Sequence, residues 1–215
     1  MKWKTKGSAS TQAGTCDEDT FFQLCRAGDI NRLLLFLQGQ RNVQEMLDAT
    51  DMQQARTGLH FAVDEGNSQV AEYLLNKGAK VDARDRTLRT PLHIACLKGY
   101  PTIAKLLLDF NADPLERNSS GLTMLHMAVC AGSTLSSLEL IVLLCRADSD
   151  LVHLKDHTGR TPLHFSVFNQ QPDMTKILQK LVQYGADVNA RDHEGNTALH
   201  FAAESGKGKV CQLLI

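Results

Sequence analysis

The chain has 215 residues, of which 43% are hydrophobic and 22% are charged, and its formal net charge is −1. This is the composition of an ordinary soluble protein, and the balanced charge gives no electrostatic basis for binding nucleic acid or a membrane surface. No stretch approaches the roughly 20 apolar residues that a membrane span requires, and the first residues contain no apolar run of the kind found in a secretory signal.

The polar segment 1–16 is expected to be a disordered tail. Order is expected to begin at Asp17, which with Asp19 would place carboxylates at the start of a helix. Two short apolar helices should follow, so that residues 17–50 form a degenerate capping repeat and a long loop, with the extra residues of that loop near 40–44.

A six-residue pattern then recurs to the end of the chain: threonine, any residue, leucine, histidine, a large apolar residue and a small residue. Its copies begin at Thr57, Thr90, Thr123, Thr161 and Thr197, and successive histidines are 33, 33, 38 and 36 residues apart. A fixed period of this size predicts an array of small stacked units. The predicted repeats cover residues 51–84, 85–117, 118–155, 156–191 and 192–215.

Each unit should be a pair of antiparallel helices. Threonine is expected to cap the first helix. In two copies the next residue is a proline, Pro91 or Pro162, whose backbone angle is already suited to a helix start. Loops between units are predicted at 82–89, 115–122, 154–160 and 189–196. Leu88 stands where the other loops have a glycine, so either that turn differs or the leucine is retained at some energetic cost.

Two units carry insertions. The fourth repeat has about five extra residues near 133–137 and 148–154, and the fifth has three at 169–172. Insertions in a regular array are typical of functional loops. The last helix runs to Ile215 on apolar residues, from which we expect the natural protein to continue.

The hexapeptide resembles the ankyrin repeat, whose period is about 33 residues and whose pattern is T-P-L-H-x-A. Five copies in register cover residues 51–215. The resemblance implies an all-α solenoid of about six stacked helix-turn-helix repeats with hairpin-like loops. It also implies a non-catalytic scaffold or adaptor that binds a partner protein, with no cofactor, metal, nucleic acid or small-molecule substrate.

The histidines invite a metal or catalytic interpretation, but five of them share one repeat position. The resemblance implies that this histidine is structural and bonds to the threonine three residues earlier and to the backbone of the adjacent loop. These residues are His60, His93, His126, His164 and His200. The other three lie scattered in loops, without partners at helical spacing. No catalytic signature accompanies them, and Gly206–Lys209 lacks the spacing of a phosphate-binding loop.

The six cysteines have neither C-x-x-C spacing nor a metal-ligand rhythm. Cys96 and Cys130 occupy small-residue positions, so packed free thiols are expected there. Reduced thiols without an export signal favour the cytoplasm, the nucleus or both.

In ankyrin repeats, partners are bound mainly by the loop tips and by the positions that end each first helix, on the concave face. Leu97 and Phe168 stand out because apolar side chains at solvent positions are typical interface anchors, although contact with a neighbouring loop would also explain them. The candidate partner-binding residues are Arg86, Leu88, Arg89, Leu97, Lys98, Leu122, Cys130, His157, Arg160, Phe168, Asn169, His193 and Glu194.

Several arginines should project along the loop edge, where they could steer an acidic partner or pair locally. Asn189 lies in a sequence similar to those modified by the asparaginyl hydroxylase of ankyrin repeats. Two other functions are compatible with the resemblance. The chain could recruit substrates for a larger enzyme, such as a ubiquitin-ligase adaptor, palmitoyltransferase or kinase, or it could inhibit a transcription factor by masking it.

Overall fold

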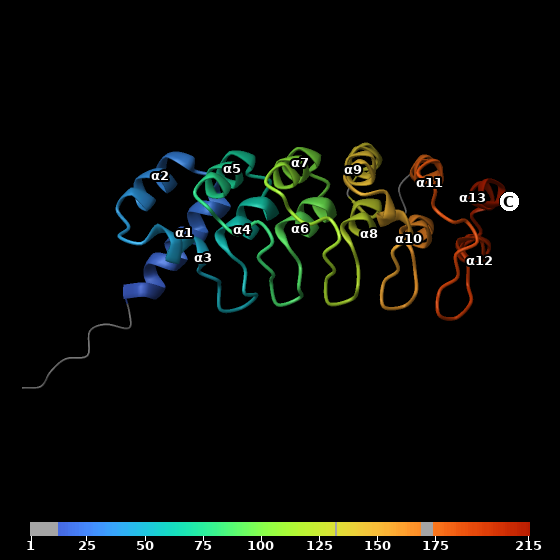
Figure 1. Cartoon of the computed structure of the whole chain (residues 1–215), viewed down its shortest axis with the longest axis horizontal. Helices are drawn as coiled ribbons and strands as arrows, with labels where there is room; N and C mark the ends of the chain where they lie inside the picture. Colours follow the sequence, from blue (N-terminus) through green and yellow to red (C-terminus); the bar gives the residue numbers. More distant parts are fainter. Residues whose placement is uncertain (1–12, 132, 169–173) are drawn as a thin grey trace, which may run out of the picture. The chain divides into compact units, whose positions relative to one another are not determined.

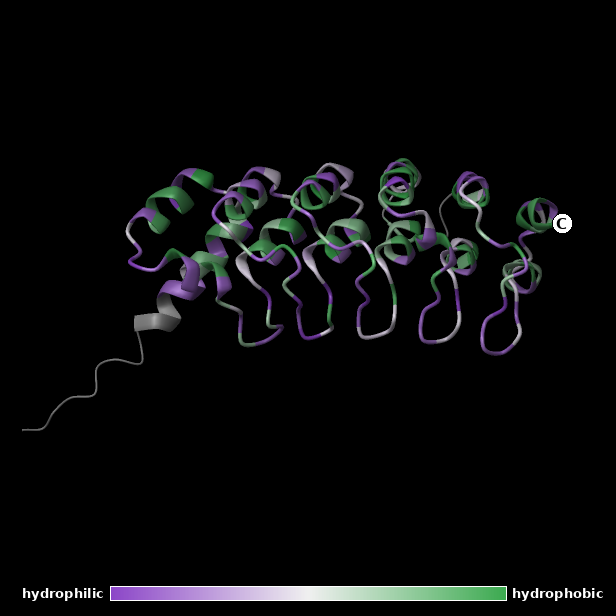
Figure 2. Ribbon diagram, in the orientation of Figure 1, coloured by the Kyte–Doolittle hydropathy of each residue, from purple (hydrophilic) through white to green (hydrophobic). Residues whose placement is uncertain are grey.

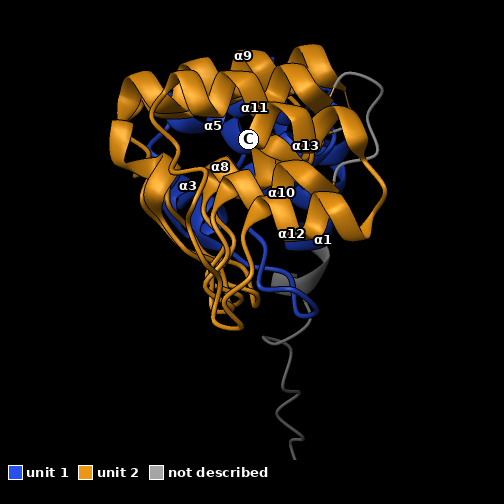
Figure 3. Ribbon diagram, turned by 90° about the vertical axis from the view of Figure 1, so that its right-hand side faces the viewer, with its two compact units in different colours: residues 1–80 blue, residues 81–215 orange. Residues whose placement is uncertain are grey.

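A computed structural model describes residues 13–131, 133–168 and 174–215, with side chains from Asp17 onward. These residues form helices and turns, with no β-strand among them. The chain divides into two compact units, residues 1–80 and 81–215 (Figure 3). The all-helical solenoid expected from the repeating pattern is therefore confirmed.

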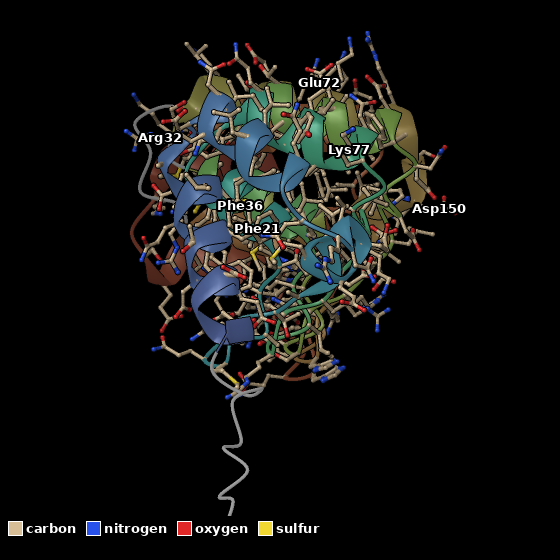
Figure 4. All side chains as sticks on the ribbon, turned by 90° about the vertical axis from the view of Figure 1, so that its left-hand side faces the viewer. Phe21, Arg32, Phe36, Glu72, Lys77 and Asp150 are labelled. Atoms are coloured by element: carbon tan, nitrogen blue, oxygen red, sulfur yellow. The ribbon has the colours of Figure 1, made fainter. Side chains whose placement is uncertain are left out.

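The first unit holds five helices: α1 (Ala13–Ala27), α2 (Ile30–Gln38), α3 (Val43–Asp48), α4 (Gly58–Asp64) and α5 (Ser68–Asn76). Its core is aromatic. The fully buried ring of Phe21 on α1 lies 6.5 Å from the ring of Phe36 on α2, centroid to centroid (Figure 4). A Cβ atom at Gly58 would stand 2.5 Å from the Phe21 ring, so only glycine lets α4 begin this close to α1. Packing against Phe21 thus explains why this copy of the hexapeptide lacks proline.

Two expectations for this unit were wrong. Helix α1 begins at Ala13, so Asp17 and Asp19 lie beyond its first turn and do not cap it. The long loop expected up to residue 50 contains α3, whose N-terminus is capped because the Asn42 side chain accepts a hydrogen bond from the Glu45 amide at 3.3 Å. Burial of Leu47 then fixes this short helix in place.

The second unit contains four consecutive helix pairs. The first helices of the pairs form one row, and the second helices form a parallel row beside it (Figure 1). The loops between pairs extend on the side of the first row (Figure 1). We call these rows the inner row, made of α6 (Pro91–Lys98), α8 (Met124–Val129), α10 (Pro162–Phe168) and α12 (Ala198–Glu204), and the outer row, made of α7 (Pro101–Asp109), α9 (Thr134–Ala147), α11 (Met174–Gln183) and α13 (Gly208–Leu214).

Leucines from both rows fill the core of the second unit. Leu92, Leu107, Leu125 and Leu144 are completely shielded from solvent. Burying such a side chain stabilises the fold by about 1.5–3 kcal/mol. Polar residues, in contrast, are frequent in the loops (Figure 2). Each helix pair therefore buries its apolar surface against the neighbouring pairs of the unit.

The insertions of the fourth repeat are helical, where we expected loops. The first lengthens α9 to 14 residues, against 9 in α7, and the Ser133 side chain caps it by accepting from the Ser136 amide at 3.2 Å. The second forms a short 3-10 helix, η1 (Ser149–His153), capped by Asp148. The insertion expected at 169–172 lies outside the described residues.

The thiols from Cys25 onward are all free. Cys96 is packed in the core as expected, and burial raises its pKa above the usual range of a thiol. Cys130 is exposed, because α8 ends at Val129 and the residue after it points away from the core. The expectation of a packed thiol at Cys130 was therefore wrong.

The four loops of the second unit share one turn that the sequence analysis missed. In each loop, a side-chain oxygen of an aspartate or asparagine accepts hydrogen bonds from the backbone amides two and four residues later, at 2.8–3.0 Å. The capping residues are Asp85, Asn118, Asp156 and Asp192. The residue three positions after each one has a positive φ, including the non-glycine residue Leu88 at 57°.

Leu88 therefore adopts the same turn as its glycine counterparts, and the left-handed conformation costs a leucine about 1 kcal/mol. Leu88→Gly should raise the free energy of unfolding by a few tenths to about 1 kcal/mol, because the relieved strain outweighs the added flexibility of the unfolded chain. Urea denaturation followed by circular dichroism measures this change.

Gly121→Ala is the matched control for Leu88→Gly. The new Cβ atom at Gly121 would lie 2.5 Å from Cδ2 of His157, so this variant should lose more than about 1 kcal/mol. A destabilised Leu88→Gly would show that contacts of the leucine side chain outweigh the backbone strain.

Candidate protein-binding surface

A repeated hydrogen-bonded clamp positions the loops of the second unit on the inner row. The amide of Thr90 donates to Nδ1 of His93 at 3.1 Å, and Nε2 of the same ring lies 3.2 Å from the carbonyl oxygen of Leu122 in the next loop. Because Nδ1 accepts a hydrogen bond from a backbone amide, the ring is the neutral tautomer that carries its proton on Nε2. The ring therefore joins the start of one helix to the following loop.

The same clamp occurs twice more in this unit. Nε2 of His126 lies 3.1 Å from the carbonyl oxygen of Arg160, and Nε2 of His164 lies 3.2 Å from that of Asn196. His60 in the first unit and His200 on α12 make the corresponding bonds to Thr57 and Thr197. These five histidines are thus hydrogen-bonded parts of the scaffold, and no group of three or more potential metal ligands occurs among the described residues.

Burial lowers the pKa of both His93 and His126 to about 4. An unfolded histidine has a pKa near 6.5, so the unfolded chain binds protons that the folded chain excludes as the pH falls from about 6.5 to 4. The stability that these rings contribute is complete above about pH 6.5 and is lost as the pH drops through this window.

We therefore expect the free energy of unfolding to fall steeply between pH 6 and pH 4.5. Removing one of these rings in His126→Gln should reduce that slope by up to about 1.4 kcal/mol per pH unit, besides lowering stability at pH 7. Urea titrations across this pH range measure it, with His153→Gln on η1 as an exposed control. An unchanged slope in His126→Gln would contradict a buried neutral ring.

Direct backbone bonds join successive loop tips. The amide of Ser119 donates to the carbonyl oxygen of Thr87 at 2.9 Å, that of His157 to Ser120 at 3.1 Å, and that of His193 to Thr158 at 3.0 Å. The exposed rings of His157 and His193 also cover the glycines of the preceding loops. These two candidate residues are therefore placed on a row of connected tips, with their rings facing solvent.

The arginines of the loop edge mostly pair locally. Arg89 Nη2 lies 2.8 Å from Asp85 Oδ2, and Arg84 Nη2 lies 2.6 Å from Glu116 Oε2. Burial acts to raise the pKa of Asp85, but hydrogen bonds from Thr87 and Arg89 outweigh it and lower the pKa to about 2. Much of the charge expected to steer an acidic partner is thus compensated inside the scaffold.

An aromatic cluster lies at the end of α10, where the sequence analysis placed Phe168. The Phe168 ring, 43% of which is exposed, lies 5.0 Å from the Phe201 ring of α12 and 6.4 Å from the Phe165 ring. The Arg160 guanidinium lies 4.9 Å from the centroid of Phe201 and 5.5 Å from that of Phe168. We call these four residues the Arg160 cluster; it combines a cation with aromatic rings in tilted and edge-to-face contact on the inner row.

Arg160 is held in this cluster from several sides. Its amide donates to Asp156, its carbonyl oxygen accepts from His126, and its Nε lies 3.5 Å from Asp192 Oδ2. The side chain therefore presents a fixed surface to a partner with little further loss of freedom. Of the cluster, sequence reasoning singled out Arg160 and Phe168 for binding. The signal for the other two is the phenylalanine that recurs directly after the repeat histidine, at Phe165 and Phe201.

The other candidate residues come from several loops and helix ends. Leu97 is 37% exposed at the end of α6, and Arg86, Leu88, Lys98 and Glu194 are exposed in their loops or helix ends. Leu122 is half-buried, and its backbone belongs to the His93 clamp. Asn169 lies outside the described residues. The exposed Asn189 donates its amide to Asp187 in the last loop.

The first unit contains a comparable arginine-aromatic contact. The Arg26 guanidinium lies 4.1 Å from the centroid of the Phe61 ring, which lies 5.3 Å from the ring of Phe22. Phe61 occupies the same repeat position as Phe165 and Phe201. An arginine above an aromatic ring after the repeat histidine is thus a recurring feature of this chain.

The described fold is a repeat solenoid of helix pairs joined by hydrogen-bonded loops. A family model described as ankyrin repeats in three copies matches residues 59–153 and 125–215. The chain belongs to the ankyrin-repeat family, whose repeats are generally protein-protein interaction modules and whose domains are typically non-catalytic. No curated protein matches its sequence.

Several solved structures are similar to the chain. The ankyrin repeat domain of Bcl-3, a member of the IkappaB family, is 32% identical, with a TM-score of 0.74 over 90% of this chain and 83% of that one. An ankyrin repeat domain of Acinetobacter baumannii is 26% identical, with a TM-score of 0.78 over 92% and 96%.

A third structure, the endopeptidase Bd0816 of Bdellovibrio bacteriovorus with the immunity protein Bd3460, contains a chain that is 20% identical; its TM-score of 0.77, over 96% and 98%, shows a shared fold alone. No described helix of the present chain is long and apolar enough to cross a membrane.

Proposed function

We propose that this chain is a non-catalytic scaffold that binds a partner protein through the inner row and loop tips of its second unit, with the Arg160 cluster as the anchor. The supporting observation is the exposed Phe168 ring, held between aromatic neighbours and a fixed arginine. Aromatic residues and arginine dominate the energetic centres of protein interfaces, and a site that is ordered before binding loses little entropy on association.

Phe168→Ser tests this function. Loss of an interface anchor weakens binding by about 2 kcal/mol or more, which is roughly 30-fold in affinity. The immobilised wild-type chain and its variants would be used to purify proteins from cell extract, and the retained proteins would be quantified by mass spectrometry. Val182→Ser is the control, because it removes another partly exposed apolar side chain, on α11 of the outer row.

The proposal predicts one or more proteins that are retained by the wild type and by Val182→Ser but strongly depleted with Phe168→Ser. Binding of each such protein would then be measured with purified components. Equal retention by Phe168→Ser and the wild type would reject the Arg160 cluster as the anchor.

A second candidate is an inhibitor that masks a transcription factor. It is favoured by the 32% identity to the ankyrin repeat domain of Bcl-3, a member of the IkappaB family. A partner recovered with the wild type would be mixed with its DNA and increasing amounts of this chain. Loss of the protein-DNA complex in a gel-shift assay would support masking, and an unaffected complex would exclude it for that partner.

A further inference from the structure

Helix α9 carries two apolar faces, although an outer-row helix needs only one. Its inward face buries Leu140, Ile141 and Leu144 completely. A second stripe faces solvent, where Leu135 is 75% exposed and Leu138 and Val142 are half-buried. The spacing of three and four residues places this second stripe along one side of the helix.

The equivalent helices of the other repeats lack this stripe. Their registers can be aligned on the first buried pair of each core face: Val70-Ala71, Ile103-Ala104, Leu140-Ile141 and Ile177-Leu178. In this register, the position of Val142 is occupied by the exposed polar residues Glu72, Lys105 and Gln179 (Glu72 is labelled in Figure 4). The N-terminal extension of α9 adds Leu135 at a place for which α7 has no helical counterpart. The outward apolar stripe is therefore specific to α9.

Leu138 and Val142 of this stripe line a groove on the outer row, of about 650 Å³, formed by residues of α7, α9 and α11. Apolar side chains line it, among them Pro101, Leu138, Val142 and Leu143, and we call this lining the floor. Three cations, Lys105, Arg146 and Lys180, contribute to the groove, one from each helix, against a single carboxylate, Glu139.

The cations of the groove are largely available. Within the described residues, the side chains of Lys105 and Arg146 take part in neither a hydrogen bond nor an ion pair, whereas Lys180 Nζ donates to Gln183 Oε1 at 3.0 Å. An apolar floor with uncompensated positive charge is complementary to a ligand that is apolar on one side and acidic along its flanks.

We propose that this groove docks an acidic amphipathic helix of a partner protein. Leucine-like side chains of that helix, spaced three or four residues apart, would fill the floor between α7 and α9, and its carboxylates would meet Lys105, Arg146 and Lys180. Helix-in-groove recognition uses this spacing of apolar anchors. The site goes beyond the proposed function, because it lies on the outer row and uses none of the Arg160 cluster.

Other occupants fit the observations less well. The chain's own segment 1–12 contains three lysines and no carboxylate, so the cations would repel it. A second copy paired by two-fold symmetry would bring the cations of both grooves together. A lipid surface would need apolar side chains that project, whereas Leu138, Val142 and Leu143 are half-buried.

A pair of synthetic helices tests the proposal. The first is a fluorescent, hydrocarbon-stapled peptide of about four turns, with leucines along one stripe and glutamates on its flanks. The second is its twin with lysine in place of every glutamate. Fluorescence anisotropy at low salt should show saturable binding of the acidic peptide and at least about tenfold weaker binding of the basic twin.

Variants of the chain then locate the binding site. Val142→Glu should weaken binding of the acidic peptide by about tenfold or more, whereas Gln179→Glu, at the matched position of α11, should change it by less than about twofold. Lys105→Glu combined with Arg146→Glu should invert the preference in favour of the basic twin. This charge exchange leaves the core untouched, so it decides the question even if Val142→Glu unfolds.

Several results would overturn the proposal: no binding of the acidic peptide, equal binding of both peptides, or a preference that the charge exchange does not alter. If the chain dimerises at higher concentration and Val142→Glu abolishes the dimer, a second copy is the occupant instead. Binding to vesicles of phosphatidylcholine and phosphatidylserine, lost in Val142→Glu, would identify a lipid surface. None of these outcomes depends on Phe168, so failure here leaves the proposed function standing.

Discussion

The second unit depends on one hydrogen-bonded arrangement, in which a buried neutral histidine links the start of an inner-row helix to the next loop. Nδ1 of His93 satisfies an amide that the helix leaves without a partner, and Nε2 satisfies a loop carbonyl 29 residues away. Leaving either group buried and unpaired would cost about 1–3 kcal/mol. Each clamp therefore stabilises a helix start and positions the neighbouring loop with the same ring.

The clamp also connects the scaffold to the candidate binding surface. The carbonyl oxygen that His126 holds belongs to Arg160, and the guanidinium of Arg160 lies against Phe168 and Phe201. Arg160, a residue of the proposed anchor, is thus hydrogen-bonded directly to a buried structural ring. The loop tips are ordered in a similar way, because each has an aspartate or asparagine turn and is joined to the next tip by a backbone hydrogen bond. Protonation of His126 at Nδ1 would remove the acceptor for the Thr123 amide, whereas Nε2 could still donate to the carbonyl oxygen of Arg160.

The repeating hexapeptide was sufficient to predict the fold, because each copy contains the same three features: a helix cap, a clamping histidine and a small packed residue. Sequence reasoning failed where a residue acts through a partner that the pattern does not reveal. Gly58 stands where Pro91 and Pro162 stand in other copies, and the pattern does not reveal that it accommodates Phe21 from another helix. The extra residues of the fourth repeat were expected in loops, but they extend α9, since Ser133 can cap a longer helix. The apolar groove is lined by residues from α7, α9 and α11, so it could not be located without the packing of three helices.

The central claim is that these rings are neutral, carry their proton on Nε2, and hold the loops through it. Long-range ¹H–¹⁵N correlation spectra of the histidine rings at pH 6 test this claim most directly. The account predicts that His93, His126 and His164 show an unprotonated Nδ1 and a protonated Nε2. Imidazolium signals, or the tautomer with its proton on Nδ1, would contradict it, because Nδ1 could then no longer accept the threonine amide.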